Sequence, residues 1–380
     1  MKAITSITAG LLALAFVGTG SAQTIVRITG STAFRAATLT AIGHVLPGAK
    51  FGYVGSSFTK STQAIFTSAD GKTIVKTSFA GSVGGIADLT KNLTVGPGGT
   101  AYPNGAGGWL VNSSPQSTTG TQITSPMFDP ATTPDVAMSD SYQKSTPFTS
   151  PALKDTLVGV IPFAWVKSIG NSTTVTIPGN FTPAVAKSLL SGTLTNIHTV
   201  GRDEDSGTHC ISYIFAGLNP FGQTPDAQYQ PSISGGHITG AVLWPGPVNV
   251  DGITYPTGHS GYASGGTLAT TLSTPTQAGI TTGFVGYLGV NDAASVNGGH
   301  NNLQWNGVSF TPAAVQKGQY NFWGYEHLLY RTSFAGAGKT FADGLAQRIL
   351  NFDASISGVI IETMSFHRTS DGGPLLPGDE

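Results

Sequence analysis

Three short polar turns, each between a strand-like run and a helical pattern, constrain the fold of this chain more than any other feature. The turns are residues 29–32, 81–85 and 205–208, and they are rich in Gly, Ser and Thr. Alternation at period 2 predicts a strand over residues 24–28, and apolar residues at helical spacing predict a helix that ends before Pro47. Strands that alternate with helices in this way indicate an α/β fold with mainly parallel sheets.

Other sequence patterns extend this alternation along the chain. Apolar runs predict further strands at residues 73–79, 157–166 and 283–290. Apolar residues at helical spacing predict helices over residues 86–89, 183–190, from near Ser206 onward, 320–330 and 340–350. Two stretches rich in Gly, Pro, Ser and Thr, at about residues 92–133 and 219–265, are interpreted as surface insertions, and the segment from His367 onward as an exposed tail.

The low charge of the chain argues against some classes of function. Only 10% of the residues are charged, less than half of the roughly 25% usual for soluble proteins, and the formal net charge is -1. A nucleic-acid partner is not expected, because neutralising phosphates requires a basic excess. The single cysteine, Cys210, excludes an internal disulfide and is interpreted as a small buried apolar residue. The histidines show no spacing suited to a metal, so neither a metal nor a cofactor is expected.

The N-terminus carries the pattern of an export signal. Lys2 is followed by an apolar run over residues 9–17 and by small residues at 20–22, which predicts a signal peptide over residues 1–22 with cleavage before Gln23. A membrane-spanning helix needs roughly 20 apolar residues, and this run is shorter. We therefore expect a soluble protein that is exported to the periplasm or another extracytoplasmic compartment.

The three polar turns have the construction of an anion-binding site. A turn that opens a helix exposes unpaired backbone N–H groups and the positive end of the helix dipole. Arg202 lies just before the third turn and can form a bidentate contact with an oxyanion. Asp140, which follows a short apolar run, can only accept hydrogen bonds when ionised. It would therefore favour hydrogen phosphate, which still carries a proton, over sulfate.

Each of these features also has a simpler interpretation, which the sequence leaves open. Ser and Thr at a helix start commonly serve as N-caps, and Asp140 could belong to an Asx turn or a cap. Arg202 could form an ion pair with a nearby acid. The three consecutive acids Asp203, Glu204 and Asp205 are interpreted as a solvated loop that stabilises the following helix N-terminus.

The sequence resembles periplasmic phosphate-binding proteins, the substrate-binding components of ABC phosphate importers. The strongest match is Arg202, three intervening residues, and then Ser206, Gly207 and Thr208. The order of the matching segments agrees over most of the chain between residues 24 and 335. The weaker matches are residues 29–34 to the first anion-binding turn of the family, residues 81–85 to its Gly-Ser-x-Gly-Gly turn, residues 137–140 to its Ala-Ser-Asp segment, and residues 285–287 to its Ile-Gly-Tyr segment.

This resemblance implies a fold, a ligand and partners. The family has the type 2 periplasmic-binding-protein fold, in which two α/β lobes, each a mainly parallel sheet flanked by helices, enclose the ligand in a cleft. The first lobe is expected over residues 23–160 and 284–380, and the second over residues 161–283. The implied partners are inorganic phosphate and an ABC permease in the inner membrane, for a monomer without catalysis or cofactor. The residues implied to bind phosphate are Ser31, Thr32, Ser82, Asp140, Arg202, Ser206, Gly207 and Thr208.

Other classes of function remain as alternatives. A hydrolase would need a nucleophile and a base, and Ser206 with His209 comes nearest. Residues 204–208 lack the first Gly of a nucleophile elbow, however, and His209 is interpreted as a surface or cap residue. A surface structural or adhesive protein would account for the Gly-rich insertions but not for three anion-binding turns. A binder of another oxyanion would share the features of a phosphate binder.

Overall fold

The computed structural model describes residues 23–102, 107–170, 175–222, 226–250 and 252–378, so the predicted signal peptide over residues 1–22 lies outside the described residues. Within them, no helix is both long and apolar enough to cross a bilayer. The α-helices are α1 (Arg35–Val45), α2 (Ser82–Lys91), α3 (Pro183–Leu190), α4 (Gly207–Phe215), α5 (Gly265–Leu272), α6 (Val290–Ala293), α7 (Pro312–Gln316) and α8 (Gly336–Asn351). The strands of the main sheet are β1 (Thr24–Gly30), β2 (Lys50–Val54), β3 (Gln63–Thr67), β4 (Thr73–Ser78), β5 (Thr121–Ile123), β6 (Val136–Ser139), β7 (Lys154–Lys167), β9 (Ile197–Val200), β14 (Gly283–Gly289) and β16 (Trp323–Tyr330).

These strands form a mixed sheet in the order β5-β2-β3-β4-β1-β6-β16-β7-β14-β9. β1 pairs in parallel with β4 and β6, and β14 pairs in parallel with β9. β16 and β7 are antiparallel to each other and to their outer neighbours β6 and β14. Parallel neighbours end at the same edge of a sheet, so the segments that follow β4, β1 and β6 emerge side by side.

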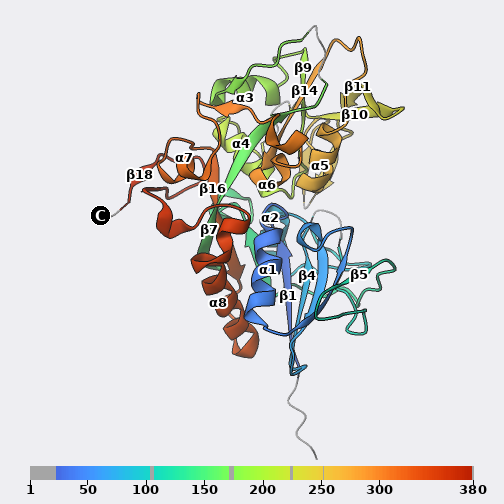
Figure 1. Cartoon of the computed structure of the whole chain (residues 1–380), viewed down its shortest axis with the longest axis vertical. Helices are drawn as coiled ribbons and strands as arrows, with labels where there is room; N and C mark the ends of the chain where they lie inside the picture. The colour runs from blue at the N-terminus through green and yellow to red at the C-terminus, as the bar shows by residue number, and fades with distance from the viewer. Residues whose placement is uncertain (1–22, 103–106, 171–174, 223–225, 251, 379–380) are drawn as a thin grey trace, which may run out of the picture.

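The elements gather into two lobes on either side of the point where β7 passes from one to the other (Figure 1). The N-terminal half of β7 pairs with β16, and its C-terminal half pairs with β14. In the first lobe, α2 and α8 pack on β1, and α1 packs on α8. In the second lobe, α4 and α5 pack on β14, and α3 packs on β9. This is the two-lobed α/β architecture of the type 2 periplasmic-binding-protein fold, as predicted from the sequence.

The chain returns to the first lobe along β16. β14 pairs with β9, so residues up to Gly289 lie with the second lobe. The sequence had led us to expect that the first lobe resumes at residue 284. β16 then pairs with β6 of the first lobe and leads into α8. The two lobes are therefore connected by β7 in one direction and by the segment before β16 in the other.

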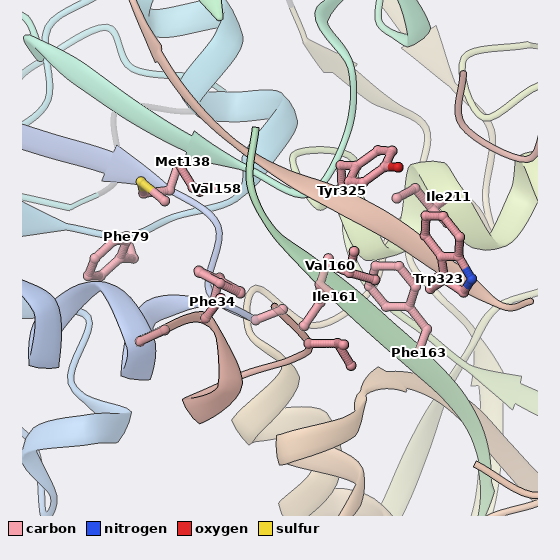
Figure 2. Packing of buried hydrophobic residues seen from close by; sticks show 14 of the residues in the cluster. Phe34, Phe79, Met138, Val158, Val160, Ile161, Phe163, Ile211, Trp323 and Tyr325 are labelled. Carbon is pink, nitrogen blue, oxygen red and sulfur yellow. The ribbon is translucent and has the colours of Figure 1, made fainter. Parts of the chain in front are cut away.

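One apolar core runs through both lobes at the crossing strand (Figure 2). Phe34 and Met138 lie on the first-lobe side of β7, whereas Ile211 of α4 lies beside Phe163 and Trp323 on the other side. All five side chains are buried. Full burial of a large apolar side chain contributes about 1.5–3 kcal/mol. The polar turns therefore lie beside a buried apolar core to which both lobes contribute.

The prediction of a helix over residues 320–330 is wrong, because most of these residues form β16. Every residue of β16 is buried, since the strand lies between β6 and β7 near the middle of the sheet. A strand covered on both faces shows no alternation of apolar and polar residues, and aromatic side chains favour such a setting. The aromatic spacing that suggested a helix is therefore equally compatible with this buried strand.

The segment after His367 is not an exposed tail. Arg368 is only 3% exposed, its guanidinium lies 3.8 Å from the centre of the Trp323 ring, and its Nη2 donates to the Asn321 carbonyl at 2.9 Å. Asp371 is buried as well and accepts a hydrogen bond from the Tyr142 amide at 2.9 Å. The C-terminal segment thus packs across the start of β16.

The two predicted insertions carry short strands among irregular segments. The first contains β5, which pairs with β2 at the edge of the main sheet. The second contains two antiparallel hairpins, β10 (Tyr229–Ser234) with β11 (His237–Leu243) and β12 (Val248–Val250) with β13 (Ile253–Tyr255). Two further pairs are β8 (Asn180–Phe181) with β15 (Gln304–Trp305) and β17 (Phe366–His367) with β18 (Leu376–Pro377).

Candidate functional site

The three predicted polar turns meet at the interface of the lobes. The first joins β1 to α1, the second joins β4 to α2, and the third joins β9 to α4. α2 begins at Ser82 rather than near residue 86, so the second turn is the first turn of the helix itself. The helix starts of both lobes therefore face one another across the interface.

Two glycines let these turns approach closely. Gly30 has a φ of +105°, and a Cβ at this position would overlap the Met138 carbonyl on β6. A Cβ on Gly85 would lie 2.9 Å from the Gly30 Cα and 3.0 Å from the Ala137 Cβ. Glycine alone tolerates both the left-handed backbone and such contacts without cost. The start of α2 consequently rests directly on the backbone of β1.

Asp140, which follows β6, joins the two lobes. Its side chain is buried, with Oδ1 accepting from the Ser82 hydroxyl at 2.5 Å and Oδ2 accepting from the Thr208 hydroxyl at 3.2 Å. A side chain on Gly207 would overlap Oδ1, so this glycine allows α4 to approach the carboxyl. Burial raises the pKa of Asp140, while the Ser82 hydroxyl and the charge of Arg202 oppose the rise. These distant partners replace the Asx turn or cap that the sequence left open.

Arg202 is a second contact between the lobes. It is 2% exposed, and its Nη2 donates to the Thr32 hydroxyl at 3.3 Å and to the Ala263 carbonyl at 3.1 Å, while Nε donates to the Tyr262 carbonyl at 2.8 Å. Among the described residues, no carboxylate lies within ion-pair distance of its guanidinium. The ion-pair interpretation of Arg202 is therefore not supported, and its charge is held in place by neutral oxygens.

Ser206 is the N-cap of α4, as the simpler interpretation allowed, whereas Ser31 accepts a hydrogen bond within the turn that precedes α1. The Ser206 hydroxyl accepts from the His209 amide at 3.2 Å at the start of α4, and the Ser31 hydroxyl accepts from the Phe34 amide at 3.3 Å. Several backbone N–H groups of the three turns have no acceptor within the part of the chain that the structure describes. They belong to Thr32, Ala33, Ser82, Gly207 and Thr208.

The third turn closes directly onto the start of α2. The Asp205 carbonyl accepts from the Val83 amide at 2.8 Å and from the Gly84 amide at 3.2 Å. A Cβ on Gly81 would overlap this carbonyl, and it would also lie 2.5 Å from the Asp205 carboxylate oxygen Oδ1. The protein's own acid thus lies at the positive end of α2, where an anion is stabilised by the helix dipole.

The prediction that the acids before Ser206 form a solvated loop is wrong, because Asp203, Glu204 and Asp205 are all buried. Glu204 accepts from the Ser260 hydroxyl at 2.7 Å. Burial raises the pKa of Asp203 to about 6, and burial together with the neighbouring Asp203 raises the pKa of Asp205 well above its usual range. These acids are therefore buried neighbours of Arg202 rather than solvated charges.

His209 is also buried, whereas the sequence suggested a surface or cap position. Its ring stacks on Tyr213 with centres 4.3 Å apart, and Nδ1 lies 2.8 Å from the Arg202 carbonyl, to which it donates in the matching tautomer. Burial lowers the pKa of His209 to about 3, and His259 nearby adds to the effect. His209 is thus a neutral support for the Arg202 backbone. Cys210 is buried, as predicted.

Glu326 is a candidate site residue that sequence reasoning missed. It lies on β16, is fully buried, and neither carboxyl oxygen has a hydrogen-bond partner within the described residues. Burial raises its pKa well above the usual range, the charge of Asp140 adds to the rise, and the nearby Ser31 hydroxyl opposes it. The available signal was a single acid within a run of aromatic and aliphatic residues. The prediction of a helix over residues 320–330 drew attention away from this signal.

Metal binding has no support in the described parts of the chain, where no three His, Cys, Asp or Glu side chains gather closely enough to hold an ion. The polar groups of the site are therefore one guanidinium, buried carboxyls, hydroxyls and backbone amides. Such a set suits hydrogen bonding to a small polar ligand.

Comparison with known proteins gives likeness only at the level of solved structures. No protein-family profile and no curated protein matches the chain. A Clostridium perfringens structure, described as a phosphate ABC transporter substrate-binding protein with bound phosphate, aligns at 14% identity over 88% of this chain and 98% of that chain, with a TM-score of 0.49. An ABC-type phosphate transport receptor from Vibrio cholerae aligns at 15% identity over 88% and 99%, with a TM-score of 0.46.

A regulatory domain is also among the similar structures. The reduced form of the OxyR2 regulatory domain from Vibrio vulnificus aligns at 10% identity over 90% of this chain and 98% of that chain, with a TM-score of 0.37. These neighbours are binding proteins and a regulatory domain. The assignment of the fold rests on the strand order and helix placement described above.

Proposed function

We propose that this chain is an exported solute-binding protein that captures hydrogen phosphate between its two lobes and delivers it to an ABC-type importer. The observation that carries the proposal is the buried carboxyl of Asp140, which accepts hydroxyl hydrogen bonds from both lobes. The buried Arg202, which forms no ion pair among the described residues, supplies positive charge close enough to oppose the rise in the pKa of Asp140.

The chemistry of these groups supports a protonated oxyanion as the ligand. The Nη1 group of Arg202 makes no hydrogen bond within the described residues and can donate to an oxyanion, and the unpaired amides at the helix starts can donate to the remaining oxygens. The Ser82 and Thr208 hydroxyls can rotate from Asp140 towards the ligand, since a hydroxyl hydrogen turns freely. Asp140 would then accept the ligand's own proton. Sulfate lacks that proton and would leave a buried acceptor without a donor.

Lobe closure would complete the capture. The crossing of β7 near residue 160 is the proposed hinge, and the hydrogen bonds of Arg202 and Thr208 to the first lobe are the proposed closing contacts. We further propose that the mature chain works as an extracytoplasmic monomer without catalysis or cofactor, with a permease of the inner membrane as its partner.

Titration calorimetry of the chain from Gln23 onward tests this function directly. Phosphate and arsenate are expected to bind, and sulfate and molybdate are expected to bind much more weakly. Arg202→Ala should weaken phosphate binding by about 10- to 150-fold, the worth of a hydrogen bond to a charged group at about 1.5–3 kcal/mol. Failure of the folded chain to bind phosphate would refute the proposal.

A matched variant controls for the loss of positive charge. Arg348→Ala removes the same side chain from α8, where Arg348 pairs with Asp353 at 2.8 Å. This variant should retain phosphate affinity. An equal loss of affinity in the Arg348 and Arg202 variants would point to long-range charge rather than to contact at the site.

A further inference from the structure

A large cavity with charged and hydroxyl side chains in its lining opens between the lobes beside the site. Its volume is about 580 Å³, and it is lined by Arg35 and Lys60 from the first lobe and by the length of α5 with its two capping residues from the second. Ser and Thr side chains make up most of the remaining lining. A neighbouring cavity of about 100 Å³ shares Arg35 and Lys60 and reaches Thr32, the residue to which Arg202 donates.

Arg35 is the unusual group in this cavity. It is 5% exposed, and its side chain makes no hydrogen bond within the described residues. Its nearest acid is Asp292, at 3.7 Å between Nη2 and Oδ1, which is longer than a hydrogen bond. A guanidinium carries five N–H donors. No Arg35 nitrogen is among the fully buried side-chain atoms that lack a partner, so these donors are open to the cavity that Arg35 lines and can take an acceptor there.

The surroundings of Arg35 favour an anion as that acceptor. Lys60 is exposed at the mouth of the cavity, where its Nζ donates to the Ser295 hydroxyl at 3.3 Å. Across the gap, a Cβ on Gly266 would lie 3.1 Å from Arg35 Nη2, so the guanidinium rests against the first turn of α5. The carboxylate of Asp292 also lies against this turn and offsets one of the two positive charges. Two positive side chains and one carboxylate therefore lie at this part of the cavity.

We propose that this cavity is a second oxyanion-binding site, in which Arg35 contacts a phosphate group and Lys60 adds a positive charge at the entrance. The site adjoins the cluster of Asp140 and Arg202 at Thr32, but its own positive groups are Arg35 and Lys60. Phosphate could reach it as the free anion or as the charged group of a small hydroxylated ester. The cavity is roomy enough for either, and its Ser and Thr lining suits hydroxyl groups.

Calorimetry with two probes, inorganic phosphate and glycerol 3-phosphate, tests the second site. Inorganic phosphate should show a second, weaker and more salt-sensitive binding event. Lys60→Gln should weaken that event several-fold without threatening the fold, because the side chain is exposed. Arg35→Lys, which keeps the charge but loses the planar fork, should weaken it by about 10-fold or more. Tighter binding of glycerol 3-phosphate at this event would identify an ester as the source, and weaker binding the free anion.

The two sites are distinguished by their variants. Arg202→Ala should remove the tighter phosphate event and leave the event at Arg35 and Lys60 in place. Lys187→Gln, on the exposed side of α3, removes an equal charge and should change neither event. The second site is refuted if neither probe shows binding that responds to Lys60→Gln and Arg35→Lys in the folded protein. That result would leave the proposal for Arg202 and Asp140 intact.

Discussion

Replacing Asp140 by Asn is the most informative perturbation, because it keeps the shape of the side chain and adds a donor. The carboxyl is 1% exposed, and its observed donors are the hydroxyls of Ser82 and Thr208. If those hydroxyls turn to a bound anion, the ligand must supply the proton that Asp140 accepts. Sulfate has none, so the wild-type chain would hold sulfate against an unpaired buried carboxylate.

The magnitude follows from that unpaired acceptor. A buried group without its hydrogen bond costs about 1–3 kcal/mol, and more when charged, which corresponds to a factor of roughly 5 to 150 in affinity. The amide of Asn can donate to sulfate and removes the penalty. The preference for phosphate over sulfate should therefore narrow by about 10- to 100-fold in Asp140→Asn, through tighter sulfate binding as well as weaker phosphate binding.

Calorimetric titration of both anions at constant ionic strength measures this ratio. Asp70→Asn, in an exposed turn of the first lobe, provides the matched control and should leave the ratio unchanged. If Asp140→Asn folds and still prefers phosphate over sulfate as strongly as the wild-type chain does, the Asp140 carboxyl does not accept the ligand's proton. An equal loss of affinity for both anions would give Asp140 a purely structural role.

Three further predictions concern stability. Gly85→Ala should lower the unfolding free energy by about 1–3 kcal/mol, because the new Cβ meets the backbone of β1. Gly344→Ala, on the open face of α8, should instead raise it by about 0.5–1 kcal/mol. Urea denaturation of both variants measures these changes. Burial raises the pKa of Asp88 to about 7, so the folded state holds a proton that the unfolded state releases above pH 4. The unfolding free energy should consequently fall by a few kcal/mol between pH 4 and 7, and Asp88→Asn should flatten this profile measured by denaturation at each pH. Arg368→Ala should lower the melting temperature by several degrees, because the guanidinium over Trp323 is buried; an unchanged melting temperature would show that the C-terminal segment does not support the core.

Local signals made part of the fold predictable. The helix over residues 183–190 was predicted with the observed bounds, because Thr182 caps it and Pro183 occupies its first position. The positions of the three turns followed from the same kind of signal. The meeting of Arg202 with Thr32, 170 residues apart, was expected only because such turns lie at the carboxyl ends of strands.

The missed features depend on tertiary packing. β16 is covered by neighbours on both faces, and its sequence carries no alternation that would separate a strand from a helix. The acids at 203–205 look solvated in sequence, but contacts with distant segments bury them, such as those of Asp205 with the start of α2 and of Glu204 with Ser260. Glu326 and Arg35 gain their significance from elements distant in sequence, which no local pattern reports.

The single cysteine makes the movement of the lobes measurable without any engineered label. Cys210 lies on α4 in the second lobe, and its Sγ is 3.8 Å from the carbonyl of Ser145 in the first. Cys210 is buried, and burial raises the pKa of its thiol well above the usual range, so we expect a thiol reagent to attack when the lobes part. The rate of thiol modification therefore reports how often the lobes open. A ligand that bridges the lobes should lower this rate in proportion to its occupancy.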